Sequence, residues 1–262
     1  MNHKRFCLLG AIAGDVIGSV HEYKAHKSTQ FELFQPGCGV TDDSVLTIAV
    51  ADAILNRRGY GEVIREYGLR YPNAGYGGMF IHWLRTGGGP YNSFGNGSAM
   101  RVSPVGWAFE RVEDVLGEAE ASAAVTHNHP EGIKGAQATA LAIYLARTGA
   151  SKEDIRREIT GRFHYNLNRK LEDIRPEYEW SEICQTSVPE SIIAFLESTD
   201  FEGTIRNAIS LGGDADTMAA IAGSIAEAYY GGVPEDIVRE VRLRVPGELW
   251  QVVEGFSGKW AG

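Results

Sequence analysis

The chain has 262 residues, 44% of them hydrophobic and 23% charged, which is the composition of an ordinary globular protein of one large domain or two small ones. Its net charge of −9 argues against non-specific binding to nucleic acid or to an anionic membrane. No apolar run approaches the roughly 20 residues of a membrane span, and the three cysteines show no disulfide spacing. We therefore expect a cytoplasmic protein without a stable nucleic-acid or membrane partner.

The N-terminal segment, residues 1–5, is basic and precedes an apolar stretch, as in a signal peptide. Two glycines and an aspartate interrupt that stretch, however, and no clean cleavage site follows it. We predict instead a buried helix over residues 6–20, with glycines that let a neighbouring backbone approach closely. Residues 21–40 lose the helical periodicity and are predicted to form a mobile loop. Glu22 stands at the start of this loop, where most glutamates are simply solvated.

A cluster of oxygen-bearing side chains, Thr41-Asp42-Asp43, opens the next predicted helix, which covers residues 41–58 and stops at Gly59. Threonine and aspartate are favoured at helix N-caps, and acidic residues suit the positive end of the helix dipole. Capping is therefore the simplest interpretation of this cluster taken alone. A cap needs only one side chain, however, and the cluster offers three.

Two shorter helices are predicted at residues 61–71 and 78–85, and a glycine-rich stretch follows at residues 87–98. Glycine lets backbone N–H groups close on an anion, so this stretch is a candidate phosphate cradle; a plain surface loop explains it equally well. It lacks the Gly-Lys-Ser/Thr of a Walker loop. No strand pattern precedes it, so it does not match a dinucleotide-binding fingerprint either.

The middle of the chain is predicted to form helices over residues 112–127 and 130–147, with Pro130 in the first turn of the second. Two histidines, His127 and His129, lie between them. Residues at i and i+2 do not share a helix face, so we expect no paired ligand role. A single contact from one of them to a ligand is the better interpretation.

Ser151 and Asp154 resemble a capping box that opens a helix ending near Phe163. Residues 164–187 are polar and are predicted to be irregular, with Tyr178 and Trp180 covering the core. Helical patterns resume in five further ranges, namely residues 188–199, 202–211, 216–230, 234–244 and 247–254.

A second acidic cluster, Asp214-Ala215-Asp216-Thr217, opens one of these helices about 170 residues after the first. Our main hypothesis is that the fold brings the two clusters together around hard divalent cations. Four carboxylates would then share a small volume. Each pair at ~4 Å repels by roughly 4 kcal/mol at an effective dielectric near 20, so the arrangement requires counter-cations. Oxygen-only ligands favour Mg²⁺ or Mn²⁺ over Zn²⁺, which prefers His and Cys.

Sustained period-two alternation, which would indicate strands, is absent from the sequence. We also find no low-complexity linker and no exposed heptad stripe that would indicate a partner helix. We therefore predict one all-α domain over residues 1–262, with roughly a dozen helices, and make no prediction of oligomeric state.

Five motifs stand out along the chain: Gly14-Asp15-Val16-Ile17-Gly18-Ser19 with Glu22, Thr41-Asp42-Asp43-Ser44, Gly95-Asn96-Gly97-Ser98-Ala99-Met100-Arg101, Thr126-His127, and Gly212-Gly213-Asp214-Ala215-Asp216-Thr217. Together these motifs resemble those of the ADP-ribosylglycohydrolases, the family of the dinitrogenase reductase-activating glycohydrolase and the ADP-ribosyl-acceptor hydrolases. The resemblance runs from about residue 6 to 231, with the motifs in the same order. Either acidic cluster alone would be weak evidence, whereas the two together are highly specific.

The resemblance implies an orthogonal bundle of helices that holds two Mg²⁺ or Mn²⁺ ions. It implies that Asp216 bridges the ions and that Glu22 is the loop glutamate beside them. The metal ligands that it implies are Thr41, Asp42, Asp43, Asp214, Asp216 and Thr217. The residues that it implies for ADP-ribose binding are Ser93, Phe94, Gly95, Asn96, Gly97, Met100 and His127, of which residues 93–97 would hold the pyrophosphate and adjoining ribose.

The implied reaction is hydrolysis of the bond between C1″ of the distal ribose of ADP-ribose and an acceptor. The substrate would be an ADP-ribosylated protein or a small ADP-ribose conjugate. Glu22, Asp43 and Asp216 would be catalytic, stabilising an oxocarbenium-like state, and a carboxylate or a metal-bound water would activate the attacking water. A two-metal nucleotide pyrophosphate hydrolase and a non-catalytic ADP-ribose binder remain alternatives. The acceptor is not predicted.

Overall fold

The structure is a computed structural model that describes residues 6–261, and within that range it contains helices but no β-strand. The basic residues 1–5, considered above as part of a signal peptide, lie outside the described residues. No helix in the described range is both long and apolar enough to cross a membrane. The helices are α1 Leu9–Gly18, α2 Asp42–Asn56, α3 Tyr60–Arg70, α4 Gly78–Thr86, α5 Gly97–Met100, α6 Ser103–Ala108, α7 Val112–Ala124, α8 Pro130–Arg147, α9 Lys152–Phe163, α10 Leu171–Glu177, α11 Cys184–Leu196, α12 Phe201–Ile209, α13 Ala215–Tyr230, α14 Glu235–Arg244 and α15 Gly247–Trp260.

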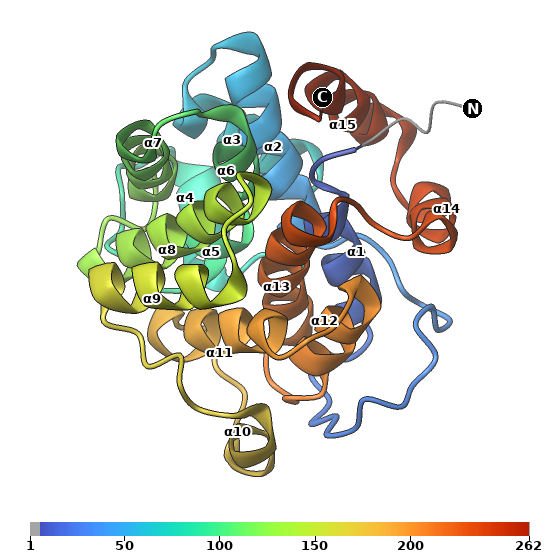
Figure 1. Cartoon of the computed structure of the whole chain (residues 1–262). Helices are drawn as coiled ribbons and strands as arrows, with labels where there is room; N and C mark the ends of the chain where they lie inside the picture. The colour runs from blue at the N-terminus through green and yellow to red at the C-terminus, as the bar shows by residue number, and fades with distance from the viewer. Residues whose placement is uncertain (1–5, 262) are drawn as a thin grey trace.

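Helices α1 and α13 lie side by side at the centre of the molecule, with α2, α8, α11 and α12 around them (Figure 1). All ten residues of α1 are buried. The two backbones touch: a Cβ atom added to Gly14 would lie 2.2 Å from the carbonyl oxygen of Ala219. Glycine is the residue that permits such an approach. The pair therefore brings the buried face of α1 against the first turns of α13.

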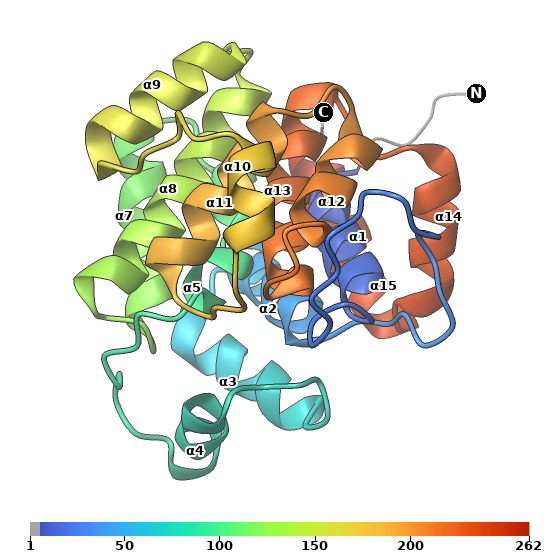
Figure 2. The same cartoon turned by 90° about the horizontal axis from the view of Figure 1, so that it is seen from below.

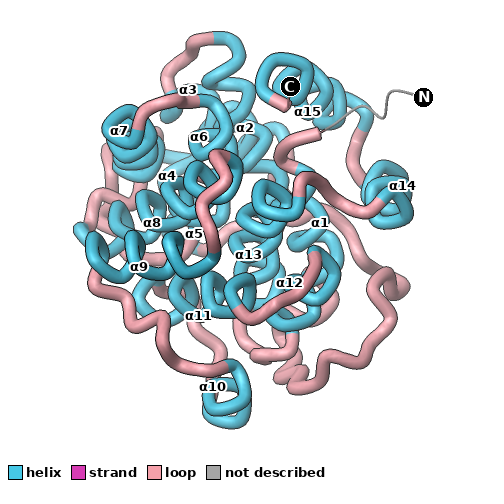
Figure 3. The backbone as a smooth tube through the Cα atoms, viewed as in Figure 1, coloured by secondary structure: helices cyan, strands magenta, loops and turns pink. Residues whose placement is uncertain are grey.

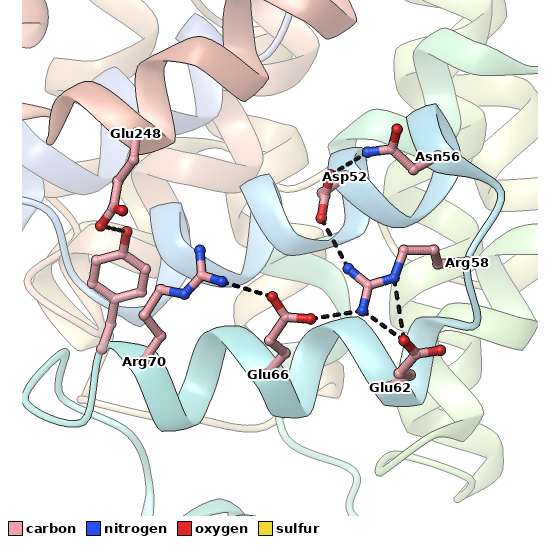
Figure 4. Close-up of polar contacts among 8 residues, drawn as sticks. Asp52, Asn56, Arg58, Glu62, Glu66, Arg70 and Glu248 are labelled. Carbon is pink, nitrogen blue, oxygen red and sulfur yellow. Dashed lines mark hydrogen bonds and ion pairs between the residues drawn. The ribbon is translucent and has the colours of Figure 1, made fainter.

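The periphery is formed by the remaining helices, with α14 and α15 on one side and α7 and α9 on another (Figures 1 and 2). Helices α3 and α4 project from the body in the view of Figure 2. A network of side chains ties α2 to α3 (Figure 4). In it, Arg58 donates to Glu62 and Glu66, both at 2.6 Å, and lies 3.6 Å from Asp52.

The long irregular segment at residues 21–40, drawn in pink in Figure 3, follows α1 as predicted. We expected it to be mobile, but several hydrogen bonds hold it against the body. Lys27 donates to the carbonyls of Tyr178 and Leu211, both at 2.5 Å. Arg206 of α12 donates to two loop carbonyls at 2.8 and 3.0 Å. The loop therefore has a defined place beside the start of α13.

The helical prediction is confirmed, with corrections at several boundaries. Helix α2 ends two residues earlier than expected because Arg57, not Gly59, adopts the left-handed conformation, with φ 55°. Helix α11 begins at Cys184 rather than at 188, because its first turn precedes Pro189 and is supported by the Ser187 hydroxyl, which donates to the Ile183 carbonyl at 2.8 Å. Helix α15 continues to Trp260 instead of stopping at 254, because Phe256 is buried in the core.

Three short helices were not predicted. Helices α5 and α6 have four and six residues, too few for a periodic pattern to be recognised. Helix α10 has seven residues and contains Pro176, and it lies in the range 164–187 that we expected to be irregular. Of the two aromatic residues expected to cover the core, Tyr178 packs against it, whereas Trp180 is 45% exposed.

Candidate functional site

The two acidic clusters meet in space, as the sequence predicted. The hydroxyl of Thr217, in the first turn of α13, donates to Asp43 Oδ2 at 3.2 Å. Asp43 stands in the first turn of α2, where the backbone leaves the long loop. Helix starts about 170 residues apart are therefore joined by a direct hydrogen bond.

Capping accounts for only part of these clusters. Thr41 is the N-cap of α2, and its hydroxyl accepts from the backbone N–H of Asp43 at 3.3 Å. Asp214 occupies the N-cap position of α13 but makes no capping hydrogen bond. Its carboxylate instead accepts from Asn96 Nδ2 at 2.8 Å. The Asp214 side chain is thus connected to the glycine-rich segment and does not cap its own helix.

Asp15 is a buried residue of the site to which the sequence analysis assigned no role. It lies on α1 and accepts three hydrogen bonds from the first cluster: from Thr41 N at 3.0 Å, from Thr41 Oγ1 at 2.7 Å and from Ser44 N at 3.0 Å. Burial raises its pKa, and these hydrogen bonds act in the opposite direction. A lone acid in the apolar, glycine-containing helix was the available signal, because a carboxylate is rarely buried without partners.

Two groups of carboxylates are compact enough to hold a cation. In each group one oxygen per residue lies within 4.8 Å of the others. One group contains Asp15, Asp43 and Asp216, and the other contains Glu22, Asp214 and Asp216. Asp216 belongs to both, so the two groups adjoin each other and share one carboxylate.

The electrostatics of the cluster favour a bound cation. Burial is the largest cause that raises the pKa of Asp43 and Asp216, and repulsion from neighbouring carboxylates adds to it. Burial and the charge of Asp15 raise the pKa of Asp42 to about 8. Asp43 Oδ1 is buried and has no hydrogen-bond partner among the described residues. An all-oxygen set with an unpartnered carboxylate oxygen suits a hard divalent cation.

Asp42 is the predicted ligand that stands apart, since it belongs to neither compact group. Its backbone N–H donates to the Ala74 carbonyl at 2.8 Å, and its side chain faces Gly75 in the loop before α4. Glu22 is itself a member of the second group, and burial is the largest cause that raises its pKa.

A pocket of about 590 Å³ opens above these carboxylates. The glycine-rich stretch divides into two parts here: residues 87–90 are exposed loop, whereas residues 91–97 line the pocket. Backbone hydrogen bonds hold the lining part, because Asn96 N donates to the Glu182 carbonyl at 2.8 Å and Cys184 N to the Phe94 carbonyl at 3.0 Å. All seven residues predicted to bind ADP-ribose line this pocket: Ser93, Phe94, Gly95, Asn96, Gly97, Met100 and His127.

The two histidines have separate places, as their spacing predicted. His129 is the N-cap of α8, and its side chain accepts from Glu131 N at 3.1 Å. His127 lines the pocket, and its Nδ1 atom lies 2.7 Å from the Thr126 hydroxyl. Pro130 occupies the first turn of α8, in agreement with the sequence analysis.

Comparison with known proteins identifies the family and the fold. The ADP-ribosylglycohydrolase family model matches residues 2–261. The chain belongs to the ADP-ribosylglycohydrolase family. It is 29% identical to the mouse ADP-ribosylhydrolase ARH3, over 97% of this chain and 88% of that protein. It is 26% identical to the ADP-ribosylarginine hydrolase Tri1 of Pseudomonas putida, over 92% and 74% of the two chains.

A solved structure described as an ADP-ribosylglycohydrolase-related protein complex has the same fold. It superposes with a TM-score of 0.76 at 27% identity, covering 96% of this chain and 95% of the other. The expectation of an all-α ADP-ribosylglycohydrolase fold is therefore confirmed. The motifs on which the resemblance rested lie around the pocket and the acidic clusters.

The pocket of this ADP-ribosylglycohydrolase has an apolar rim that the sequence analysis foresaw only at Phe94. Six large hydrophobic side chains are exposed within residues 6–261, and four of them line the pocket: Tyr23, Met79, Phe94 and Trp180. Tyr23 and Trp180 stack on each other across two irregular segments, with ring centroids 6.4 Å apart. The opening is thus apolar, although its floor is acidic.

Proposed function

We propose that the protein is a metal-dependent hydrolase that cleaves the bond between C1″ of the distal ribose of ADP-ribose and an acceptor, releasing ADP-ribose. The convergence of the two acidic clusters beneath one pocket carries this proposal. Family membership and relatives that are named ADP-ribosylhydrolase and ADP-ribosylarginine hydrolase support it. Neither a nucleotide pyrophosphate hydrolase nor a non-catalytic binder is favoured by these observations.

We further propose that the cluster holds two Mg²⁺ or Mn²⁺ ions, with Asp216 common to both. The ligand set is the predicted one, namely Thr41, Asp42, Asp43, Asp214, Asp216 and Thr217, with Asp15 and Glu22 close to it. When bound, such ions neutralise the carboxylates and orient ribose hydroxyls. A bound cation would give the unpartnered Asp43 Oδ1 atom a partner. It would also favour the ionised form of Asp43, whose pKa is raised in its absence.

The residues of the chain then have distinct tasks. Residues 93–97, Met100 and His127 bind the ADP portion, while the carboxylates hold the distal ribose. Asp43, Asp216 and Glu22 present negative charge to the carbon at which positive charge develops, which stabilises an oxocarbenium-like state. Glu22 is the best placed of these to accept a proton from water, because it stands on the loop and reaches the cluster from the solvent side.

The proposal is tested by measuring ADP-ribose release from a panel of ADP-ribosyl-arginine, ADP-ribosyl-serine, poly(ADP-ribose) and O-acetyl-ADP-ribose with Mg²⁺ present. We expect release from at least one conjugate, and its loss on EDTA treatment and in the Asp216→Asn variant. The panel also identifies the acceptor, for which the arginine conjugate named in the Pseudomonas relative is the first choice. AMP as product would contradict glycosidic cleavage, and full activity of metal-free protein would contradict the metal site.

The cytoplasm remains our proposed location. Among the described residues, which include all three cysteines, there is no disulfide, which fits a reducing compartment. Fractionation of the native cells tests this.

A further inference from the structure

Beside the pocket, Arg101 is buried without enough acceptors for its donors. Its side chain is 0% exposed, and one nitrogen donates to the Ser122 carbonyl and to the Thr126 hydroxyl, both at 2.9 Å. Its Nε and Nη1 atoms have no hydrogen-bond partner among the described residues. Arginine has five N–H donors and no acceptor. Any group that forms a hydrogen bond with Arg101 must therefore be the acceptor in that bond.

The Thr126 hydroxyl lies between Arg101 and His127, so its acceptor role toward Arg101 determines what it can offer His127. It is fully buried and lies 2.9 Å from Arg101 Nη2 and 2.7 Å from His127 Nδ1. A hydroxyl has one proton to donate. Since Thr126 accepts from Arg101 Nη2, its own proton is free to be donated to His127 Nδ1, which uses both the donor and an acceptor of the hydroxyl. The imidazole proton is then left on Nε2.

His127 Nε2 faces space that two glycines keep open. A Cβ atom added to Gly97 would lie 3.2 Å from Nε2, and one added to Gly95 would lie 3.5 Å from it. These glycines belong to the segment that we propose holds the pyrophosphate. Burial, and secondly the charge of Arg101, lower the pKa of His127 well below its usual value, so the ring is neutral and its tautomer decides what Nε2 offers.

We propose that Arg101 and Thr126 are positioning residues that hold His127 in the Nε2–H tautomer, so that this N–H is a fixed donor to a phosphate oxygen of ADP-ribose beside Gly95 and Gly97. The inference rests on the proposed function for the identity of the ligand. The tautomer itself is a property of the ligand-free protein. We call the hydrogen bonds from Arg101 through Thr126 to His127 the relay. Arg101 and Thr126 therefore affect ADP-ribose binding through His127 and not by contact with the substrate.

The first experiment reads the tautomer directly by long-range ¹H–¹⁵N correlation NMR of histidine-labelled protein with Mg²⁺ and no nucleotide, using His127→Gln to assign the signal. We expect the Nε2–H pattern in the wild type and in Thr126→Ser, which keeps the hydroxyl. Thr126→Val removes it and is expected to give a mixture of tautomers. An Nδ1–H pattern in the wild type, or no change in Thr126→Val, overturns the inference.

Tyr91 supplies a control, because its hydroxyl is the competing partner for the Thr126 proton. Burial raises the pKa of Tyr91, and the Thr126 side chain acts against that shift. If Thr126 donates to His127, Tyr91→Phe keeps the Nε2–H pattern. If Thr126 instead donates to Tyr91, the wild type carries the Nδ1–H pattern, and loss of the tyrosine hydroxyl frees the Thr126 proton for His127. Conversion from the Nδ1–H to the Nε2–H pattern in Tyr91→Phe would therefore overturn the inference.

The second experiment measures ADP-ribose binding by calorimetry. Losing a fixed hydrogen bond to a charged group corresponds to about tenfold weaker binding or more, so we expect this for Thr126→Val and recovery in Thr126→Ser. In a His127→Gln background the valine substitution should cost nothing further, because the two residues act as one unit. If Thr126→Val weakened ADP-ribose binding in the His127→Gln background as much as in the wild type, Thr126 would have only a structural role. Absence of ADP-ribose binding and turnover in the wild type would instead refute the proposed function, while the NMR result would stand.

Discussion

At the scale of single residues, the acidic cluster departs furthest from ordinary behaviour. Isolated carboxylates ionise below neutral pH, but burial raises the pKa values of Asp15, Asp42, Asp43, Asp214 and Asp216, and repulsion from neighbouring carboxylates adds to this effect for all of them except Asp15. A raised pKa means that the ionised form is disfavoured in the folded protein. In the absence of cations these residues therefore oppose folding, and a cation should reverse that effect.

One consequence is a dependence of stability on pH in the metal-free protein. Asp42, with a folded pKa of about 8 and an unfolded value near 3.9, binds more protons when folded than when unfolded. The contribution of Asp42 to the stability of the folded protein is complete below its unfolded pKa. This contribution is lost as the pH rises through its folded pKa, by up to about 1.4 kcal/mol per pH unit. His21, with a folded pKa lowered to about 4 by burial, has the opposite slope, but that slope ends near pH 6.5.

We therefore expect the melting temperature in EDTA to fall between about pH 6.5 and 8, with a smaller fall in Asp42→Asn. Thermal unfolding followed by circular dichroism measures this. A melting temperature that rises over the same interval would show that the carboxylates are not held in the raised-pKa state.

A second prediction concerns Asp216, which is common to both carboxylate groups. Asp216→Asn removes a buried charge that Asp43, Asp214 and Glu22 repel, so the metal-free variant should be more stable than the wild type by about 1 kcal/mol or more. Mg²⁺ at a hundredfold excess over its Kd should stabilise the wild type by about 2.7 kcal/mol and the variant much less.

Unfolding with and without Mg²⁺ provides the measurement. Asp52→Asn is the matched control, because Asp52 lies on the same helix as Asp43 but pairs with Asn56 and Arg58 (Figure 4). Its response to Mg²⁺ should equal that of the wild type. Equal stabilisation of all three proteins would place the cation elsewhere.

At the scale of elements, the contact between α1 and α13 decides where Asp15 and Asp216 meet. Gly14 and Gly18 of α1 face the backbone of Ala219 and of Asp216, with no room for a Cβ atom at either. Interdigitated side chains would hold the helices at 8–10 Å between axes, whereas glycine permits a closer approach. The carboxylate on α1 can therefore reach the first turn of α13.

Gly14→Ala should separate the two helices. The added methyl group would lie 2.2 Å from a backbone oxygen, so we expect a loss of about 1–3 kcal/mol in the free energy of unfolding, as for other overpacked sites. Metal affinity should fall as well, because Asp15 moves with α1. Chemical denaturation and calorimetric Mg²⁺ titration give the two numbers.

Gly117→Ala is the control for this substitution, since Gly117 lies on the exposed face of α7 with nothing within 4 Å of an added Cβ atom. There alanine should stabilise the helix by about 0.5–1 kcal/mol. If both variants gained stability, the α1–α13 contact would not be the tight one described.

At the scale of the whole molecule, the loop at residues 21–40 joins the site to the periphery. It leaves α1 with Glu22 and Tyr23 over the pocket, and it returns at Thr41 to open α2. Lys27 anchors it to the carbonyl of Leu211, three residues before Asp214. The position of Glu22 therefore depends on contacts with the α12–α13 turn, far away in the sequence.

Lys27→Met should release this anchor while leaving the core intact. A small displacement of a catalytic group can cost about a hundredfold in rate, so we expect kcat to fall by about ten- to a hundredfold with little change in melting temperature. Hydrogen exchange of residues 21–40 should quicken. Lys24→Met, an exposed lysine of the same loop, should alter neither. Unchanged turnover in Lys27→Met would mean that the anchor does not position Glu22.

Much of the site could be predicted from the sequence, because it depends on which types of residue stand at particular positions. Oxygen-bearing side chains at two helix starts, and glycines beside polar residues at 93–97, are local features of the chain. Other parts were not visible for physical reasons. Asp15 looks like one acid in an apolar helix until its three hydrogen bonds with Thr41 and Ser44 are seen. Trp180 looks like a core residue until its stacking on Tyr23 at the rim is known.

The sequence by itself determined the helical class, the absence of a strand pattern and the chemistry of the two acidic clusters, because periodicity and side-chain type are local properties. The tertiary structure alone decided that Asp43 and Thr217 touch, that Asp216 belongs to two carboxylate groups and that Arg101 reaches His127 through Thr126. Those relations depend on how closely α1 and α13 pack and on which loops fold back over them. Such distances follow from the fit of many distant side chains at once, which no single stretch of sequence contains.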